Sequence, residues 1–277
     1  YRFSIEWARV EPEEGKFDPE AIEHYRKVIA CCKAHGVEPI VTLLHFTSPK
    51  WLICKGGWET ESTVEDFKRY VTYVMDQLGS ELRYVCTINE ANMGLQLATI
   101  SKRFRLMAEQ AAQNAASAGK SAEGTVQVGM NFQKMMENMK YAAMENAQVF
   151  GTPQPKIFVS ERTPEGAELT QMDYEVYPQA LEHVIRKVAE EFKGDLIVTE
   201  NGIATADDAR RVAFIRQALD GVQHCIADGI PVKGYFHWSL MDNFEWQKGY
   251  AMQFGLIAVN RETMERTAKP SLAVLGS

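Results

Sequence analysis

The chain has 277 residues, 45% of them hydrophobic and 24% charged, which suits a single globular domain over residues 1–277. Its net charge of −7 argues against nucleic acid or an anionic membrane as a partner, because both are bound by a basic face. No apolar run approaches the roughly 18–20 residues of a membrane-spanning helix, and the chain opens without a basic-then-apolar signal segment.

Short runs rich in Val, Ile, Phe, Tyr and Thr alternate with longer helical segments. Most of these runs are almost continuously apolar, as expected for strands buried on both faces. The alternation with helices predicts an α/β protein. The predicted strands are Phe3–Trp7, Pro39–His45, Arg83–Asn89, Val126–Asn131, Lys156–Ser160, Leu196–Glu200 and Val232–Trp238.

Helix start and stop signals separate the predicted strands. Asp18, followed by proline, predicts a capped helix that ends at Gly36. A capping box at Ser62–Glu65 predicts the next helix. Two further helices are predicted after Pro178 and Asp207, and an Ala- and Gln-rich stretch has helical propensity over residues 101–124.

Repeated strand–helix–strand units predict a parallel sheet with right-handed crossovers. Neither GxGxxG nor GxxxxGK[ST] follows a predicted strand, so an open nucleotide-binding sheet lacks its main signal. Polar residues instead lie at or just past the C-terminal ends of strands, where a (β/α) barrel carries its catalytic groups. These residues are His45, Asn89, Glu90, Asn131, Glu200, Asn201, His237 and Trp238. The pattern favours a closed barrel over an open doubly wound sheet.

Two glutamates lie where a buried strand is predicted to end. Glu90 follows RYVCTIN and Glu200 follows LIVT, and each is next to an asparagine. A carboxylate in such a place is poorly solvated, which shifts or splits pKa values as acid/base and nucleophile pairs require. One such glutamate is more simply a helix cap or an ion-pair partner. Two on the same predicted face favour the paired carboxyls of glycoside hydrolysis, with retaining and inverting spacings both open.

The segment from Gly234 to Tyr250 combines aromatic and polar residues. Tyr235 and Phe236 fall within a predicted strand and are most simply core residues. Trp238 and Trp246 instead flank an Asp-Asn-Phe-Glu run, so we expect them to face a polar ligand. A pyranose presents apolar C–H patches on its faces and hydroxyls at its rim, which suits such a loop.

Histidine and cysteine show no metal-binding pattern. His45 ends a predicted strand and is the histidine best placed for a sugar hydroxyl. No CxxC occurs and no three ligands converge in the sequence, so we expect no metal site. Five cysteines form no disulfide framework, which indicates a reducing compartment, and we expect a cytoplasmic protein.

Five motifs resemble glycoside hydrolase family 1 and follow that family's order. TINEAN at Thr87–Asn92 resembles the acid/base signature, and VTENGIA at Val198–Ala204 is similar to the nucleophile motif. The other motifs are YRFSIEWARVEPEEGKFD, LHFTSPKWL with the following GGW, and HWSLMDNFEWQKGY. The resemblance implies a (β/α)8 TIM barrel and a retaining, β-glucosidase-like hydrolase of carbohydrate metabolism. It implies a small-molecule or oligosaccharide β-glycoside as substrate and no cofactor.

The resemblance also implies roles for individual residues. Glu90 would be the acid/base, and Glu200 would be the nucleophile, with Arg2 holding it ionised. Asn89 would bind the 2-hydroxyl of the sugar. The other implied sugar contacts are His45, Trp238, Glu245 and Trp246.

Glu245 bears on whether the substrate is a phosphorylated or an unphosphorylated sugar. Members of the family that act on 6-phosphorylated sugars have a serine and a lysine in place of the acidic pair of this loop. Glu245 would repel a phosphate. The resemblance therefore implies unphosphorylated β-glucosides, β-galactosides or β-fucosides as substrates of a glycosidase that cuts from the non-reducing end.

The sequence departs from the family pattern at several points. Ala91 replaces the usual proline after the acid/base, and Phe46 replaces a common tryptophan. The family's first strand has no counterpart, and the strand whose tyrosine contacts the nucleophile is not recognisable around Lys156–Arg162. We therefore expect an incomplete barrel. A catalytically impaired sugar-binding barrel, or a fragment of such an enzyme, is the alternative, and a metal-dependent barrel enzyme is a more remote one.

Overall fold

The computed structural model describes residues 1–91, 168–172 and 174–276 of the chain. They belong to two compact units, Tyr1–Ser160 and Glu161–Ser277, and each unit is described by itself. The strands predicted over Val126–Asn131 and Lys156–Ser160 lie outside the described residues, as does the helical stretch at 101–124. The single domain over residues 1–277 stays a prediction.

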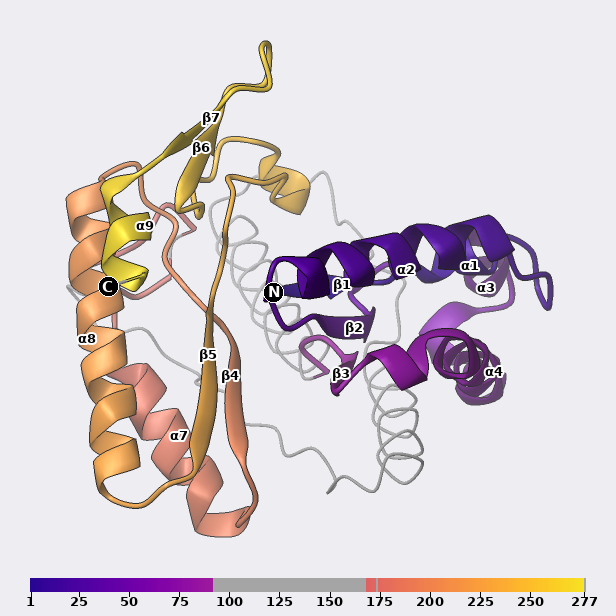
Figure 1. Ribbon diagram of the computed structural model, residues 1–277, viewed down its shortest axis with the longest axis horizontal. Coiled ribbons are helices and arrows are strands. Elements are labelled where there is room, and N and C mark those ends of the chain that lie inside the picture. The colour runs from indigo at the N-terminus through magenta and orange to yellow at the C-terminus, as the bar shows by residue number, and fades with distance from the viewer. Residues whose placement is uncertain (92–167, 173, 277) are drawn as a thin grey trace, which may run out of the picture. The chain divides into compact units, whose positions relative to one another are not determined.

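The first unit contains a three-stranded parallel sheet. Its strands are β1 (Arg2–Ser4), β2 (Ile40–Leu44) and β3 (Tyr84–Ile88), in the order β1-β2-β3 (Figure 1). β2 lies between its two neighbours and is buried at all five positions. Because the strands are parallel, their C-terminal ends lie at the same edge of the sheet.

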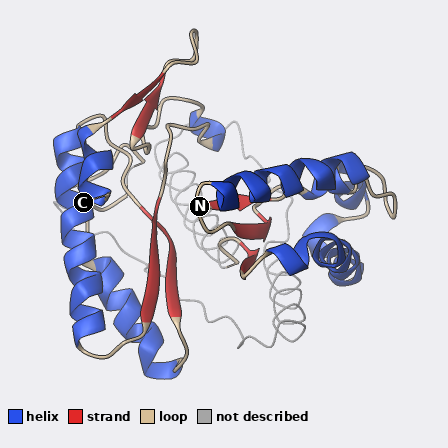
Figure 2. Ribbon diagram, viewed as in Figure 1, coloured by secondary structure: helices blue, strands red, loops and turns tan. Residues whose placement is uncertain are grey.

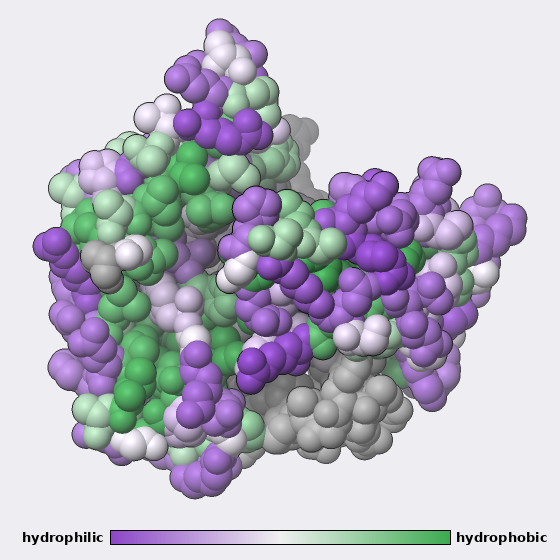
Figure 3. All heavy atoms as spheres, viewed as in Figure 1, coloured by the Kyte–Doolittle hydropathy of each residue, from purple (hydrophilic) through white to green (hydrophobic). Residues whose placement is uncertain are grey.

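The helix α2 of the first unit begins at its predicted cap. Asp18 caps α2 by accepting a hydrogen bond from the Glu20 N–H over 2.8 Å, as predicted. α2 buries Ala21, Ile22 and Tyr25, and its side chains in view are mostly hydrophilic on the outside (Figure 3). The helices are α1 (Trp7–Val10), α2 (Pro19–Ala34), α3 (Lys50–Cys54) and α4 (Ser62–Leu78), with 3₁₀ turns η1 (Gly57–Glu59) and η2 (Gly79–Glu81).

Trp7 is at the centre of the core of the first unit. Its ring is 1% exposed and stacks on Tyr70 with centroids 5.0 Å apart. The Tyr70 hydroxyl donates to the Leu43 carbonyl of β2 over 3.0 Å. The Trp7 indole N–H donates to the fully buried Glu11, whose charge is matched by Arg69 at 2.7 Å. These contacts hold the segment after β1 firmly against β2, which fixes the edge where the site residues lie.

The second unit is built on the parallel pair β4 (Leu196–Asn201) and β5 (Val232–His237). Figure 1 shows α7 (Ala180–Glu191) and α8 (Asp208–Ala227) lying beside this pair. Val198, Val222 and Val232 form part of the core between strands and helices, with Tyr235 packed against them as predicted. The remaining elements are η3 (Trp246–Lys248), the antiparallel strands β6 (Ile257–Val259) and β7 (Arg266–Ala268), and α9 (Pro270–Leu275).

Two local predictions are wrong, while the other strands predicted within the described ranges are present (Figure 2). The strand predicted over Phe3–Trp7 ends at Ser4, and Trp7 begins α1 instead. Glu6 causes this change because its side chain accepts the Ala8 N–H and caps the helix. The capping box at Ser62–Glu65 is also absent, since residue 61 is the N-cap of α4 and makes no side-chain cap.

Candidate active site

Three predicted site residues meet across the first sheet: Arg2 of β1, His45 after β2 and Asn89 after β3. Asn89 is 6% exposed, and its N–H continues the sheet by donating to the Leu44 carbonyl over 2.8 Å. Its Oδ1 accepts from Arg2 Nη2 over 2.6 Å, and its Nδ2 lies 3.3 Å from His45 Nε2. Arg2 Nε also donates to the buried Thr42 hydroxyl over 2.9 Å. Arg2, Asn89 and His45 therefore form one hydrogen-bonded chain.

The hydrogen-bonded chain of Arg2, Asn89 and His45 defines which groups donate and which accept. Because Arg2 can only donate, the amide oxygen of Asn89 must face it, and the amide nitrogen must face His45. His45 Nε2 is then the acceptor, which assigns its proton to Nδ1. One hydrogen of the Asn89 amide faces His45, and the amide carries a second hydrogen that can be donated to a ligand oxygen.

Glu90 leaves β3 through an unusual backbone turn. It is exposed and has a φ of 43°, in the left-handed region that residues other than glycine seldom adopt. This conformation breaks the alternation of side chains along the strand at the point where the glutamate follows Asn89. Backbone strain of this kind is concentrated at functional sites, so it is a second reason to consider Glu90 functional.

Glu200 lies near the end of β4, where the two strands of the second unit are tied together. The next residue, Asn201, accepts from the Tyr235 hydroxyl over 2.8 Å, and its carbonyl accepts from the Trp238 N–H over 2.8 Å. Burial raises the pKa of Tyr235, so its hydroxyl remains a donor. At Gly202 a Cβ atom would lie 1.9 Å from the Trp238 carbonyl oxygen, so this close approach requires glycine.

The loop after β5 places a second carboxylate near Glu200. Burial and the charge of Glu200 both raise the pKa of Glu245, so the two groups are electrostatic neighbours. The Glu245 N–H donates to the Gly249 carbonyl over 2.7 Å, which closes a tight turn around η3. Trp246 begins this turn with a φ of 44° and is 43% exposed. The predicted contacts Glu245 and Trp246 thus lie on one constrained loop.

His237, the last residue of β5, has a different environment. Burial, together with the positive charge of Arg211, lowers its pKa to about 4, although the nearby Phe254 backbone acts in the opposite direction. Both ring nitrogens are inaccessible to solvent. His237 is therefore a neutral histidine near Arg211 of α8, consistent with a side chain that alternation directs away from the site.

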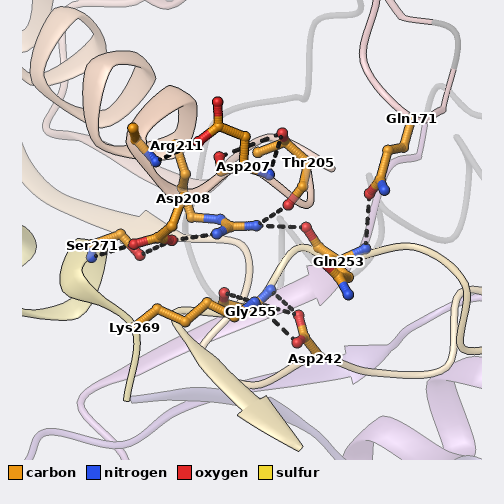
Figure 4. Close-up of polar contacts among 11 residues, drawn as sticks. Gln171, Thr205, Asp207, Asp208, Arg211, Asp242, Gln253, Gly255, Lys269 and Ser271 are labelled. Atoms are coloured by element: carbon orange, nitrogen blue, oxygen red, sulfur yellow. Dashed lines mark hydrogen bonds and ion pairs between the residues drawn. The ribbon is translucent and has the colours of Figure 1, made fainter. Parts of the chain in front are cut away.

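A buried polar network at the base of the same loop was not predicted from the sequence (Figure 4). Arg211 is fully buried and Lys269 is mostly buried, and both donate to carbonyl groups of the loop. The only local signal was the i, i+3 pair of Asp208 and Arg211 at the start of α8. A lysine before a helix-starting proline gives no comparable signal.

Within the described ranges, no group of three His, Cys, Asp or Glu side chains is arranged to hold a metal ion. The cysteines, including the buried Cys225 and the exposed Cys31 and Cys54, are free thiols. No helix that the structure describes is long and apolar enough to cross a membrane. In the first unit the candidate site residues are Arg2, His45, Asn89 and Glu90, and in the second unit they include the carboxylates Glu200 and Glu245. Groups of these types suit proton transfer and hydroxyl binding.

A family comparison decides the class of this protein. The sequence model of glycosyl hydrolase family 1 matches residues 1–105 and 120–275. The chain belongs to glycosyl hydrolase family 1. It is a glycoside hydrolase, and the motifs around Glu90 and Glu200 lie within the matched residues.

Some similar proteins are named for unphosphorylated sugars and others for phosphorylated sugars. A β-glucosidase from Agrobacterium sp. is 28% identical, with 98% of this chain and 78% of the relative covered. A 6-phospho-β-galactosidase from Lacticaseibacillus casei is 25% identical, with 98% and 82% covered. The Agrobacterium alignment runs over 359 residues, so that relative has internal segments without a counterpart in these 277 residues.

Solved structures of β-glucosidases show the same fold. The apo structure of β-glucosidase 1317 is 38% identical, has a TM-score of 0.83, and matches 99% of this chain and 82% of that one. The Thermotoga maritima family 1 β-glucosidase bound to isofagomine lactam has a TM-score of 0.79 at 22% identity, with 98% and 80% covered. The predicted fold is confirmed as the (β/α)8 barrel of family 1 in an incomplete form.

Proposed function

We propose that this family 1 hydrolase is a retaining exo-β-glycosidase in which Glu90 is the acid/base and Glu200 is the nucleophile. The proposal is carried by one observation: each glutamate lies at the C-terminal end of a strand in a parallel sheet. In a (β/α) barrel this is the end that carries the catalytic groups. Each glutamate also lies within the family motif that corresponds to its proposed role.

The proposed reaction has two steps at one carbon atom. Glu90 donates its proton to the glycosidic oxygen while Glu200 attacks the anomeric carbon, so the aglycone leaves and a glycosyl ester forms on Glu200. Glu90, now a carboxylate, removes a proton from water, which attacks the same carbon and releases Glu200. Two inversions give net retention. The retaining mechanism requires the two carboxyl groups to be about 5–5.5 Å apart in the active enzyme.

The hydrogen-bonded chain at β3 supports a role for Asn89 in binding the sugar. Arg2 donates to its amide oxygen and one amide hydrogen faces His45, and we assign the second amide hydrogen to the 2-hydroxyl. An interaction at this hydroxyl strengthens in the transition state of glycoside hydrolysis. We assign His45 to a further hydroxyl, and Trp238 and Trp246 to the faces and rim of the ring. A role for Arg2 in holding Glu200 ionised remains a prediction from the family resemblance.

Glu245 supports an unphosphorylated substrate. A sugar hydroxyl can donate to this carboxylate, whereas a 6-phosphate would face the charges of both Glu245 and Glu200. The names of relatives leave this question open because they include both classes. We expect an aryl β-glucoside to be cleaved at least about 100-fold more efficiently than an aryl 6-phospho-β-galactoside, since like-charge contacts cost several kcal/mol. The reverse preference would contradict this assignment.

The proposed function is tested by hydrolysis of an aryl β-glucoside. The wild-type chain should release the phenol, Glu200→Ala should abolish turnover, and Glu262→Ala, at an exposed glutamate, should leave it unchanged. Turnover should also be insensitive to a chelator, because no step uses a metal. Inhibition by the chelator would favour a metal-dependent enzyme.

The internal segments that the Agrobacterium relative has and this chain lacks favour one alternative, a catalytically impaired sugar-binding barrel. An active hydrolase and a catalytically impaired barrel would both bind the sugar, but only the hydrolase would cleave an aryl glycoside. If no aryl glycoside is hydrolysed while calorimetry still detects binding of deoxynojirimycin, the enzyme proposal fails and the binding proposal is retained. Hydrolysis that Glu200→Ala removes would exclude the binding-only alternative.

A further inference from the structure

A single buried guanidinium joins the two segments that carry Glu200 and Glu245. Arg211 is fully buried, and its Nη2 donates to the Thr205 carbonyl over 2.5 Å and to the Gln253 carbonyl over 2.7 Å (Figure 4). Thr205 belongs to the segment that leaves β4 after Glu200, and Gln253 belongs to the return of the loop that carries Glu245. A backbone hydrogen bond from Thr205 to Gln253 over 3.0 Å completes the junction.

The charge of Arg211 is matched within the fold. Asp208, one helical turn earlier on α8, pairs with Arg211 Nη1 and accepts two hydrogen bonds from Ser271, at 2.7 and 2.8 Å. Burial alone would raise the pKa of Asp208, but the bonds from Ser271 and Arg211 outweigh it and lower that pKa. Asp208 is thus a stable anion that ties the start of α9 to the start of α8.

A second cation, Lys269, closes the base of the Glu245 loop. Its Nζ donates to both oxygens of Asp242, at 3.0 and 2.9 Å, and to the Gly255 carbonyl over 2.8 Å (Figure 4). Asp242 also accepts the Gly255 N–H over 2.8 Å. Asp242 and Gly255 are the two ends of the loop, and both charged side chains are only 15% exposed. Bonds between buried charges are worth more than exposed ion pairs.

Two features would favour movement of this loop: aromatic residues near its tip are exposed, and Glu245 is close enough to Glu200 to be repelled by its charge. Phe244 and Tyr250, on either side of η3, are 56% and 58% exposed. Burial and the charge of Glu200 both raise the pKa of Glu245, so a larger separation of the two carboxylates would reduce their repulsion. The fixed base opposes this movement.

We propose that Arg211 and Lys269 are positioning residues that set the distance between Glu200 and Glu245. Arg211 fixes the segment after β4 against the loop, and Lys269 fixes the two ends of the loop against each other. The inference rests on the proposed function, in which Glu245 binds the sugar that Glu200 attacks. Arg211 is buried and Lys269 is mostly buried, and both donate to backbone carbonyls, so they act through the backbone.

The test compares Lys269→Met and Arg211→Met with Lys269→Arg and with a matched control, Arg210→Met. Arg210 is the neighbouring cation on α8, but it bonds to Leu169 and Glu168 rather than to the loop. KM for an aryl β-glucoside should rise about tenfold in both Met variants, while kcat changes less than about threefold, because sugar binding is weakened in ground and transition states alike. Lys269→Arg should restore KM to near the wild-type value, and Arg210→Met should leave it unchanged.

The assays are run well below the unfolding temperature of each variant, so that loss of folded protein does not enter KM. If Arg211→Met does not fold, Lys269→Met and its rescue by arginine still decide the question. Lower unfolding temperatures with unchanged KM would overturn the inference and leave the proposed function intact. If the wild type shows no turnover, the proposed function fails instead, and a tenfold loss of deoxynojirimycin affinity in Lys269→Met, measured by calorimetry, would still support positioning. Unchanged affinity would overturn it.

Discussion

The two units hold their candidate site residues in different ways. In the first unit, Asn89 and His45 extend directly from the ends of β3 and β2, and hydrogen bonds from Arg2 through Asn89 hold them. In the second unit, Glu200 is part of β4, but Glu245 lies on a loop whose ends are held by buried cations. The first arrangement depends on strand register and the second depends on long-range side-chain bonds.

The two groups of residues also differ in the electrostatics of their contacts. The first group pairs a cation with neutral donors and acceptors, so each contact is favourable. The second group holds two carboxylates close enough that Glu200 raises the pKa of Glu245, and it holds a histidine that is neutral by burial. We therefore expect pH to affect the second unit more than the first, and mutations at Asn89 to act mainly through sugar binding.

After Glu200→Ala, which should abolish turnover, the largest effect is expected at Glu90. Glu90→Gln removes the proposed proton donor, and general acid–base catalysis is worth about 10²–10⁴-fold. We expect kcat/KM to fall by about that factor for a methyl β-glucoside, and by much less for 2,4-dinitrophenyl β-glucoside, whose leaving group needs no proton. Equal losses on both substrates would contradict the acid/base assignment.

A stability measurement across pH tests the neutral histidine of the second unit. The folded pKa of His237 is lowered to about 4 from an ordinary 6.5, so the unfolded chain binds more protons between these values. Its contribution to the free energy of unfolding should be present above pH 6.5 and fall by about 2–3 kcal/mol as pH drops toward 4. His237→Gln should flatten that part of the curve measured by urea unfolding.

The matched control for this measurement is His24→Gln, at an exposed histidine of α2. We expect this variant to keep the wild-type dependence of unfolding free energy on pH. An equal flattening in both variants would show that burial of His237 is not the cause.

Asn89→Ala tests the hydrogen-bonded chain of Arg2, Asn89 and His45 in the first unit. Arg2 would lose an acceptor and His45 would lose a donor, and hydrogen bonds to charged groups contribute about 1.5–3 kcal/mol. We expect kcat/KM for an aryl β-glucoside to fall about 10- to 100-fold. Asn201→Ala, which removes the acceptor of Tyr235 in the second unit, should cost about 1 kcal/mol of stability and less activity. Equal kinetic losses would remove the distinction between the two units.

The smallest effect is expected for the stability of Glu245→Gln. Because the folded pKa of Glu245 is raised, the native state binds more protons than the unfolded chain just above the ordinary pKa, so stability falls as pH rises through that window. Removing the charge should raise the unfolding free energy at pH 7 by less than about 1 kcal/mol, because solvent screens a partly exposed pair. It should give no gain at pH 3. Destabilisation at pH 7 would contradict the proposed repulsion.

Most of the strands and the strand-end residues could be predicted from the sequence, because both follow from local patterns. Buried parallel strands are apolar runs. Glu90 follows the end of β3, and Glu200 follows the apolar run Leu196–Thr199 within β4. The early end of β1 could not be foreseen in the same way, because the burial of Trp7 among Tyr70 and Trp58 depends on distant residues.

The contacts of Arg211 and Lys269 with the Glu245 loop could not be predicted from the sequence either. Arg211 bonds to a carbonyl 42 positions away, and Lys269 pairs with a carboxylate 27 positions away. No period or spacing signals such contacts, since they arise when three segments of the second unit meet at the ends of β4 and β5. The left-handed conformations of Glu90 and Trp246 are likewise imposed by the surrounding fold rather than by residue type.

The central claim is that Glu200 is the nucleophile, and trapping its intermediate tests it most directly. The wild-type chain is incubated with 2,4-dinitrophenyl 2-deoxy-2-fluoro-β-glucoside, digested, and mapped by mass spectrometry. The account predicts a stoichiometric burst of dinitrophenol and one fluorosugar esterified to Glu200, with no label in Glu200→Ala. A label on another residue would contradict the claim, as would hydrolysis of an aryl β-glucoside that gives the inverted sugar first.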